Sequence, residues 1–139
     1  MKDLGEADVI LNIKLIKDES GITLLQSHYV EKVLSQFGFM DSKPSPTPYD
    51  PSVTLRKNKK IGRDHLRYSQ IIGSLMYLAS ATRPDIYFVV SKLSRYTSNP
   101  DDDHWRALER VLRYLKGTMS FGIHYSRHPV VLEGYSDSN

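Results

Sequence analysis

The stretch that decides the fold is Tyr68-Ser-Gln-Ile-Ile-Gly-Ser-Leu-Met-Tyr-Leu-Ala-Ser80, followed by Ala81-Thr-Arg-Pro-Asp-Ile86. At about 100° per residue its apolar side chains share one side of a helix, namely Tyr68, Ile71, Ile72, Leu75, Leu78 and Ala79. The other side carries Ser69, Gly73 and Tyr77, four residues apart. A glycine inside a helix costs about 1 kcal/mol relative to alanine. Because Gly73 lies away from the apolar face, the pattern predicts a surface where a flat or grooved partner approaches the backbone.

Two further helices are predicted downstream of this one. The second begins at Pro84, a residue favoured in a first helical turn, and its core face holds Ile86, Val89, Val90, Leu93 and Tyr96. The third begins within Asp101–Asp103 and ends at Gly117, and its apolar face holds Trp105, Leu108, Val111, Leu112 and Leu115. Together the three predict a helical unit over residues 64–117.

Upstream, residues 1–42 predict a β-hairpin and a helix. The alternation from Val9 to Ile16 has a period of two, which indicates one strand with one buried face. Residues 18–21 predict a turn, and residues 22–26 a second strand. Ser27 is expected to cap a helix that runs through Phe37 and stops at Gly38. Its apolar stripe comprises Tyr29, Val30, Val33, Leu34 and Phe37.

Residues 43–63 have a different composition. Regular structure is broken by Pro44, Pro46, Pro48 and Pro51, and a basic run follows with Arg56, Lys57, Lys59 and Lys60. We expect an extended, partly mobile connector. The basic run continues through Arg63 and Arg67, and it suits a nonspecific nucleic-acid contact and a solubilising linker equally well.

After the third helix, residues 118–139 predict two short strands, at 121–125 and 130–136. The expected fold class is therefore α+β: an N-terminal β-hairpin plus helix, a three-helix unit and a short C-terminal β pair. With 139 residues the chain is at most one ordinary domain, and its net charge of +3 is weak support for a polyanionic partner.

The absence of cysteine excludes disulfides and thiolate metal sites. No apolar run approaches the roughly 18 residues of a membrane span, and no signal-peptide core is present. We expect a cytoplasmic or nuclear protein that is neither secreted nor membrane-bound.

Several short motifs occur in a fixed order along the chain. They are Met1–Glu6, Leu25–Leu34, Pro46–Asp50, Ile72–Tyr77, Thr82–Asp85, Trp105–Gly117 and Gly134–Asp137. The ordered set resembles the Pol polyprotein of copia-type LTR retrotransposons, in the region just after the polymerase active site. Residues 70–77 also resemble the thumb helix of retroviral reverse transcriptases, which in that family follows the minor groove of the template–primer duplex.

The resemblance implies a parent that is an RNA-directed DNA polymerase with ribonuclease H. Residues 1–42 would then be the end of the palm, 43–63 the connector, 64–117 a thumb-like unit and 118–139 the truncated start of the ribonuclease H domain. Asp137 matches that domain's first metal-binding aspartate, and its partner carboxylates are missing here. The family's Tyr-x-Asp-Asp signature is also absent. We therefore expect no catalysis and no cofactor in this chain, and magnesium in the parent enzyme.

The resemblance also implies nucleic-acid contacts, with an RNA–DNA or DNA duplex and the rest of the polyprotein as partners. Candidates on the first thumb-like helix are Ser69, Gln70, Gly73 and Tyr77, for which the alternative is packing against a second helix. Candidates on the third are Arg106, Arg110 and Arg113, for which the alternative is a solvated basic face. The same alternatives apply to Lys92 and Arg95.

Other polar residues have structural interpretations. The triplet Asp101–Asp103 suits helix capping better than metal binding, and Arg83-Pro-Asp85 looks structural. The histidines form no ligand cluster, and His124 and His128 do not predict a zinc site. Two alternatives to a duplex-binding segment stay open: a non-catalytic nucleic-acid- or protein-interaction module, and a translated relic without function.

Overall fold

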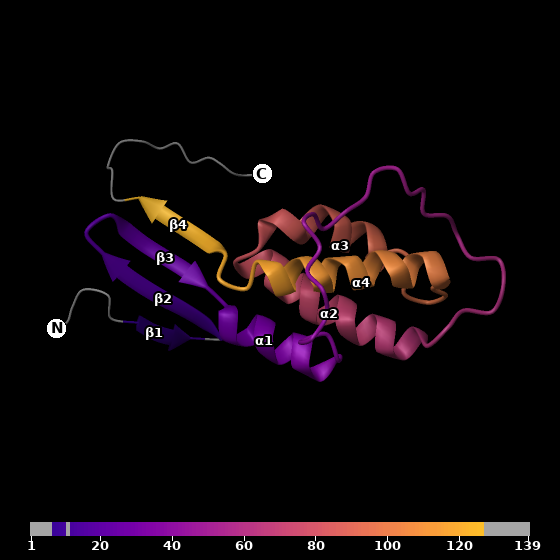
Figure 1. The fold of residues 1–139 in the computed structure, drawn as a ribbon, viewed down its shortest axis with the longest axis horizontal. Helices are drawn as coiled ribbons and strands as arrows, with labels where there is room; N and C mark the ends of the chain where they lie inside the picture. Colours follow the sequence, from indigo (N-terminus) through magenta and orange to yellow (C-terminus); the bar gives the residue numbers. More distant parts are fainter. Residues whose placement is uncertain (1–6, 11, 127–139) are drawn as a thin grey trace.

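The computed structural model describes residues 7–10 and 12–126, which form an antiparallel sheet at one end of a helical bundle (Figure 1). The strands are β1 (Ala7–Ile10), β2 (Ile13–Asp18), β3 (Gly21–Leu25) and β4 (Gly122–Ser126). The helices are α1 (Ser27–Gln36), α2 (His65–Ala81), α3 (Tyr87–Ser94) and α4 (Asp102–Gly117), with a 3-10 turn η1 (Pro84–Ile86) before α3. The predicted α+β class is confirmed.

The hydrophobic core lies between the helices. Its members are Val30, Val33, Leu34, Phe37, Tyr68, Ile71, Ile72, Leu75, Leu78, Ala79, Ile86, Val89, Val90, Leu93, Trp105, Leu108, Val111, Leu112, Tyr114 and Leu115. The predicted apolar faces of the helices are therefore the buried ones, except that Tyr29 is only partly buried and Tyr96 lies beyond the end of α3 and is also only partly buried. Each fully buried aliphatic side chain contributes about 1.5–3 kcal/mol. None of the side chains of β2, β3 and β4 belongs to this cluster.

The sheet joins the two ends of the described chain. Its order is β1-β2-β3-β4, and every neighbouring pair is antiparallel. In the β3–β4 pair, Leu24 lies opposite Ile123. The predicted strand at 121–125 thus forms, and its partner is the N-terminal hairpin. The second predicted C-terminal strand, 130–136, lies outside the described residues.

The N-terminal prediction needs one correction. The alternating run from Val9 to Ile16 is not a single strand, because β1 ends at Ile10 and β2 begins at Ile13 as its antiparallel partner. Asn12 has a φ of 68°, in the left-handed region that asparagine tolerates better than most residues. The predicted turn at 18–21 is confirmed, with the Asp18 carboxylate accepting from the backbone N–H groups of Ser20 and Gly21.

The helix ends follow the predictions with two differences. Gln26, not Ser27, is the N-cap of α1, and its side chain makes no capping bond. The segment that starts at Pro84 opens as the 3-10 turn η1 and becomes α-helical only at Tyr87. Gly38 follows α1 with a φ of 82°, so the predicted stop is confirmed.

The connector, residues 43–63, runs without regular structure across the helices (Figure 1). The extended conformation is as predicted. The connector is nevertheless fastened to the bundle, since Ser45 N–H donates to the Arg113 carbonyl over 3.2 Å and Tyr96 OH donates to the Leu55 carbonyl over 3.3 Å. It is part of the folded unit and not a free linker.

Candidate nucleic-acid interface

The α2 stripe, defined as Ser69, Gly73 and Tyr77, lies on the outer side of α2. The Ser69 hydroxyl donates to the Leu66 carbonyl over 2.8 Å, so this side chain is turned back on its own helix. Gly73 is exposed, and a Cβ added there would meet no heavy atom within 4 Å. Nothing in the described structure therefore requires a glycine at this position for packing.

Tyr77, by contrast, takes part in internal packing. Its ring meets the Tyr29 ring of α1 edge to face, with the centroids 5.2 Å apart, and the residue is 37% exposed. Arg67, further toward the start of α2, donates to the Phe37 carbonyl over 3.0 Å. These two contacts show that α1 runs antiparallel along α2. The packing interpretation therefore holds at Tyr77, whereas Gly73 has an open backbone and Gln70 is exposed beside it. Contact of this open part with a duplex stays a prediction.

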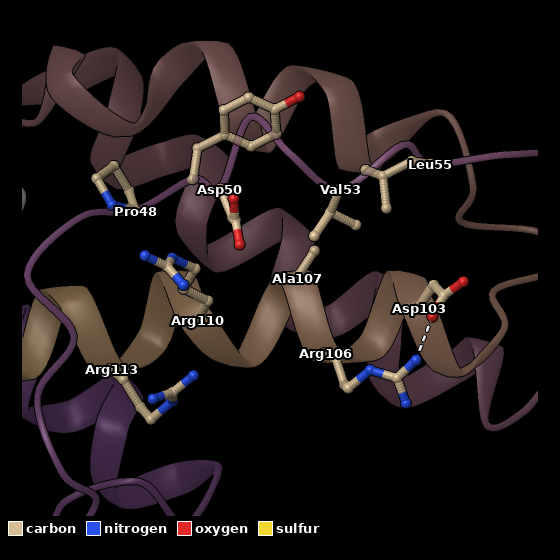
Figure 2. A pocket seen from close by; sticks show the side chains of 10 residues that line it. Pro48, Asp50, Val53, Leu55, Asp103, Arg106, Ala107, Arg110 and Arg113 are labelled. Carbon is tan, nitrogen blue, oxygen red and sulfur yellow. Dashed lines mark hydrogen bonds and ion pairs between the residues drawn. The ribbon is translucent and has the colours of Figure 1, made fainter.

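The three α4 arginines differ in how they are engaged (Figure 2). Arg106 pairs with Asp103, one turn earlier on the same helix. Arg110 donates to the Thr47 carbonyl over 3.1 Å and to the Thr47 hydroxyl over 2.6 Å, which ties it to the connector. The half-buried Arg113 guanidinium makes no hydrogen bond or ion pair with any residue that the structure describes. The basic face is therefore partly neutralised and partly covered.

A groove of about 310 Å³ separates the connector from α4 (Figure 2). Its walls are Pro48, Tyr49, Asp50, Val53, Leu55, Asp103, Arg106, Ala107, Arg110 and Arg113. Hydrogen bonds from the Ser52 hydroxyl and N–H hold the pKa of Asp50 below its usual value of 3.8, and the Arg110 charge lowers it further. The groove thus combines an apolar floor with charges of both signs. The α2 stripe borders α1 and the arginines border the connector, so the two candidate sets adjoin different elements.

The cations on and after α3 are also unequal. The Lys92 ammonium group donates to the Tyr49 hydroxyl over 3.2 Å and lies 5.6 Å from the centre of the Phe88 ring. Arg95 is exposed. Lys92 therefore helps to pack the connector onto α3. Neither sequence interpretation of Lys92, as a phosphate contact or as part of a solvated basic face, anticipated this contact.

The acidic triplet at the start of α4 has the capping role that was predicted. The Asp101 carboxylate accepts from the N–H groups of Asp103 and His104, and Asp102 pairs with Arg63 over 2.5 Å. Within the described residues no group of three His, Cys, Asp or Glu side chains is placed to hold a metal ion. Asp137 lies outside the described residues.

The structural interpretation of residues 83–85 is also supported. Arg83 is only 1% exposed; its guanidinium forks onto Asp85 at 3.1 and 2.8 Å and reaches the Thr118 carbonyl at 3.0 Å. Tyr114 OH donates to Asp85 over 2.6 Å. Burial acts to raise the pKa of Asp85, but the bonds from Arg83 and Tyr114 outweigh it and hold that pKa below 3.8. This cluster ties η1 to the end of α4.

Sequence reasoning missed the role of His104. Its Nδ1 accepts from the Asp101 N–H over 2.9 Å, which completes a capping box, and its Nε2 lies 2.8 Å from the Arg56 carbonyl. Its ring stacks on Tyr96 with the centroids 3.9 Å apart. The only local signal was a polar residue three positions after an N-cap aspartate.

Comparison with known proteins identifies the source of the ordered motifs. The chain is 36% identical over 148 aligned positions to the retrovirus-related Pol polyprotein from transposon TNT 1-94 of Nicotiana tabacum. This alignment covers all of the chain and 11% of the tobacco protein. It is 38% identical over 142 positions to the Pol polyprotein from transposon RE2 of Arabidopsis thaliana, covering all of the chain and 10% of that protein. The chain is homologous to transposon Pol polyproteins.

This homology confirms the resemblance to copia-type Pol polyproteins. The chain spans about a tenth of the length of these relatives. A shorter relative, an uncharacterized mitochondrial protein of Arabidopsis thaliana, is 33% identical and is covered over 58% of its length. No family model matches the chain, and no solved structure matches it. In the described residues, no helix is long and apolar enough to cross a membrane.

Proposed function

We propose that this Pol segment is the thumb-like, duplex-contacting part of a reverse transcriptase and ribonuclease H polyprotein. The observation that carries the proposal is Gly73, exposed at mid-helix with open space around it. A glycine that costs about 1 kcal/mol in helix stability and serves no internal contact is best explained by an external partner. The homology to Pol polyproteins supports a template–primer duplex as that partner.

The chemistry of the α2 face suits a groove that is read by shape. Around Gly73 the helix offers bare backbone, the exposed Gln70 amide and the Ser69 hydroxyl oxygen, which can still accept a hydrogen bond while its proton is donated to Leu66. Such groups approach a minor groove closely and bond to base edges and sugar hydroxyls with little regard for sequence. A polymerase that must follow any template needs that kind of contact.

The segment itself is proposed to be non-catalytic. Among the described carboxylates, Asp101, Asp102 and Asp103 are occupied by a helix cap and two arginine pairs. They do not suit the shared coordination of divalent ions that polymerases and nucleases use. The magnesium expected at the parent's polymerase site would therefore be held by carboxylates elsewhere in the polyprotein, and Asp137 would hold a metal ion only in a complete ribonuclease H domain. Primer extension with divalent metal and deoxynucleotides should give no product, and synthesis by the isolated chain would overturn this part.

The binding proposal is tested by Gly73→Leu, measured by fluorescence anisotropy with a labelled RNA–DNA hybrid of about 20 base pairs, a little longer than the ~16 that a double-stranded RNA-binding domain spans. We expect at least tenfold weaker binding because the leucine side chain stands between the helix and the duplex. We expect an unchanged circular dichroism spectrum because a Cβ at this position meets no heavy atom within 4 Å. Ser35→Leu adds the same group to an exposed position of α1 and should leave affinity unchanged. Equal affinity of wild type and Gly73→Leu, with both folded, would refute the role of the stripe.

A protein-interaction module is the second candidate, and exposed aromatic side chains favour it. Tyr87 and Phe88, at the start of α3, are 51% and 64% exposed, and Phe121 before β4 is 52% exposed. Exposed aromatic side chains are enriched where proteins bind one another. This candidate predicts an association that persists at high salt, whereas phosphate contacts weaken steeply with salt. In either case we propose a cytoplasmic or nuclear location.

A further inference from the structure

The basic strip, defined as residues 56–60, carries four cationic side chains and no acidic one. Arg56, Lys57, Lys59 and Lys60 are all exposed. Within the described residues, none of their side chains makes a hydrogen bond or an ion pair. The sequence alone left this run undecided between a nucleic-acid contact and a solubilising linker.

The backbone of the strip is held in place by side chains of the bundle. The Arg56 carbonyl lies 2.8 Å from His104 Nε2, and Asn99 Nδ2 donates to the carbonyls of Asn58 and Lys60 over 3.2 and 2.9 Å. His104 is fully buried and is itself fixed by its capping bond. A solubilising linker needs no such anchors. The anchors fix the course of the backbone while the charged side chains remain exposed.

Nearby carboxylates do not neutralise the strip, because each already has a partner. Asp101 caps α4, Asp102 pairs with Arg63 and Asp103 pairs with Arg106. Asp64, just before α2, accepts from the Arg67 N–H. The positive charge of the strip is therefore available to an external anion.

We propose that the basic strip is a preformed contact for the phosphate backbone of a nucleic acid, additional to the α2 stripe. The proposal rests on the duplex binding proposed above. The homology of the chain to Pol polyproteins favours a phosphate backbone over an acidic protein surface as the partner of these exposed cations. Lysines act as point charges, so the strip reads no sequence.

Preorganisation is what the anchors add to this contact. A flexible basic segment must lose backbone freedom when it binds, and this loss subtracts from affinity. In the strip that freedom is already limited by His104 and Asn99. Asn99 is thus a positioning residue, and it should influence affinity without touching the nucleic acid.

The test compares two triple variants of the whole 139-residue chain with equal net charge. The strip variant is Lys57→Gln, Lys59→Gln and Lys60→Gln. The control variant is Lys17→Gln, Lys32→Gln and Lys43→Gln, at exposed positions elsewhere. Binding to an RNA–DNA hybrid is measured from about 0.05 to 0.2 M salt. Each lost phosphate contact should reduce the slope of log K against log salt by about 0.7–0.9 and weaken binding roughly five- to eightfold at 0.1 M.

We expect the strip variant to lose about two units of slope and the control variant less than about half a unit. Asn99→Ala should weaken binding a few-fold with the slope unchanged, since it removes an anchor and no charge. Equal slopes for the two triple variants would overturn the strip while leaving the α2 stripe intact. Failure of the wild-type chain to bind the hybrid would overturn both proposals. Displacement of the hybrid by polyglutamate of equal total charge would show that the surface binds polyanions in general. That result would also overturn the proposal that the strip is a phosphate contact.

Discussion

Replacing Arg83 with methionine is expected to destabilise the chain by about 3 kcal/mol. Arg83 is 1% exposed, and its guanidinium makes two bonds to Asp85 and two to Thr118. Methionine retains much of the apolar stem but leaves the Asp85 carboxylate without its cation. Breaking a buried ion pair by removing one partner costs about 3–5 kcal/mol. The lower end of that range of energies applies because the Asp85 side chain is 34% exposed and stays partly hydrated.

The assay is equilibrium urea unfolding followed by circular dichroism. A loss of about 3 kcal/mol corresponds to a melting temperature lower by roughly 10 °C in a domain of this size. The matched control is Arg106→Met, because Arg106 and Asp103 form an ion pair at 69% and 54% side-chain exposure. Exposed pairs contribute at most about 1 kcal/mol. Arg83→Lys should recover little, since an ammonium group cannot fork onto Asp85 and also reach Thr118. Equal destabilisation by Arg83→Met and Arg106→Met would refute the reasoning.

The lowered pKa of Asp85 means that its stabilising charge is complete above 3.8 and is lost as the pH falls through the lower folded-state value. Urea unfolding between about pH 2 and 5 should therefore show a smaller acid loss for Asp85→Asn than for wild type; parallel curves would contradict this. Gly73→Ala should raise the free energy of unfolding by up to about 1 kcal/mol, and a decrease would mean that the site is not open. Tyr77→Ala should lower both stability and hybrid affinity because it removes the ring contact with Tyr29, whereas Gln70→Ala should lower affinity alone. Urea unfolding measures stability and anisotropy measures hybrid affinity, so both are applied to the same samples of the two variants. A loss of stability in Gln70→Ala would refute the expected difference between Gln70 and Tyr77.

The helices were predictable because their signal is local. The apolar spacing of α2 and α4 selects one face wherever the rest of the chain lies, and those faces are the buried ones. The strand break was not predictable from periodicity. β1 and β2 both alternate, so a tight turn through Asn12 leaves the period of two almost undisturbed. Only the turn tendency of asparagine carried that information, and the surrounding apolar residues obscured it.

The residue types of the candidate site were predictable from the sequence, but which of those side chains are already bound within the fold was not. Sequence showed three arginines on one face of α4, yet the engagement of Arg110 depends on Thr47, 63 positions earlier in the chain. The contact between His104 and the Arg56 carbonyl likewise spans 48 positions. Contacts at such separation depend on how the connector lies across the bundle, and no local pattern encodes that course. The prediction of a partly mobile linker did not anticipate these anchors.

These contacts suggest which end of α2 meets a duplex. The later part of the stripe is partly covered, since Tyr77 packs against Tyr29 of α1. The earlier part keeps an open backbone at Gly73 and an exposed amide at Gln70. Residues 61–64 connect this earlier end directly to the basic strip. Shape-reading groups and uncommitted charges thus occur within one short stretch of the chain, with the basic strip before α2 and with Gln70 and Gly73 between the start and the middle of that helix. A duplex that lies along both would place its groove on α2 and a phosphate backbone on the strip. The connector would then help to hold the nucleic acid as well as join the two parts of the fold.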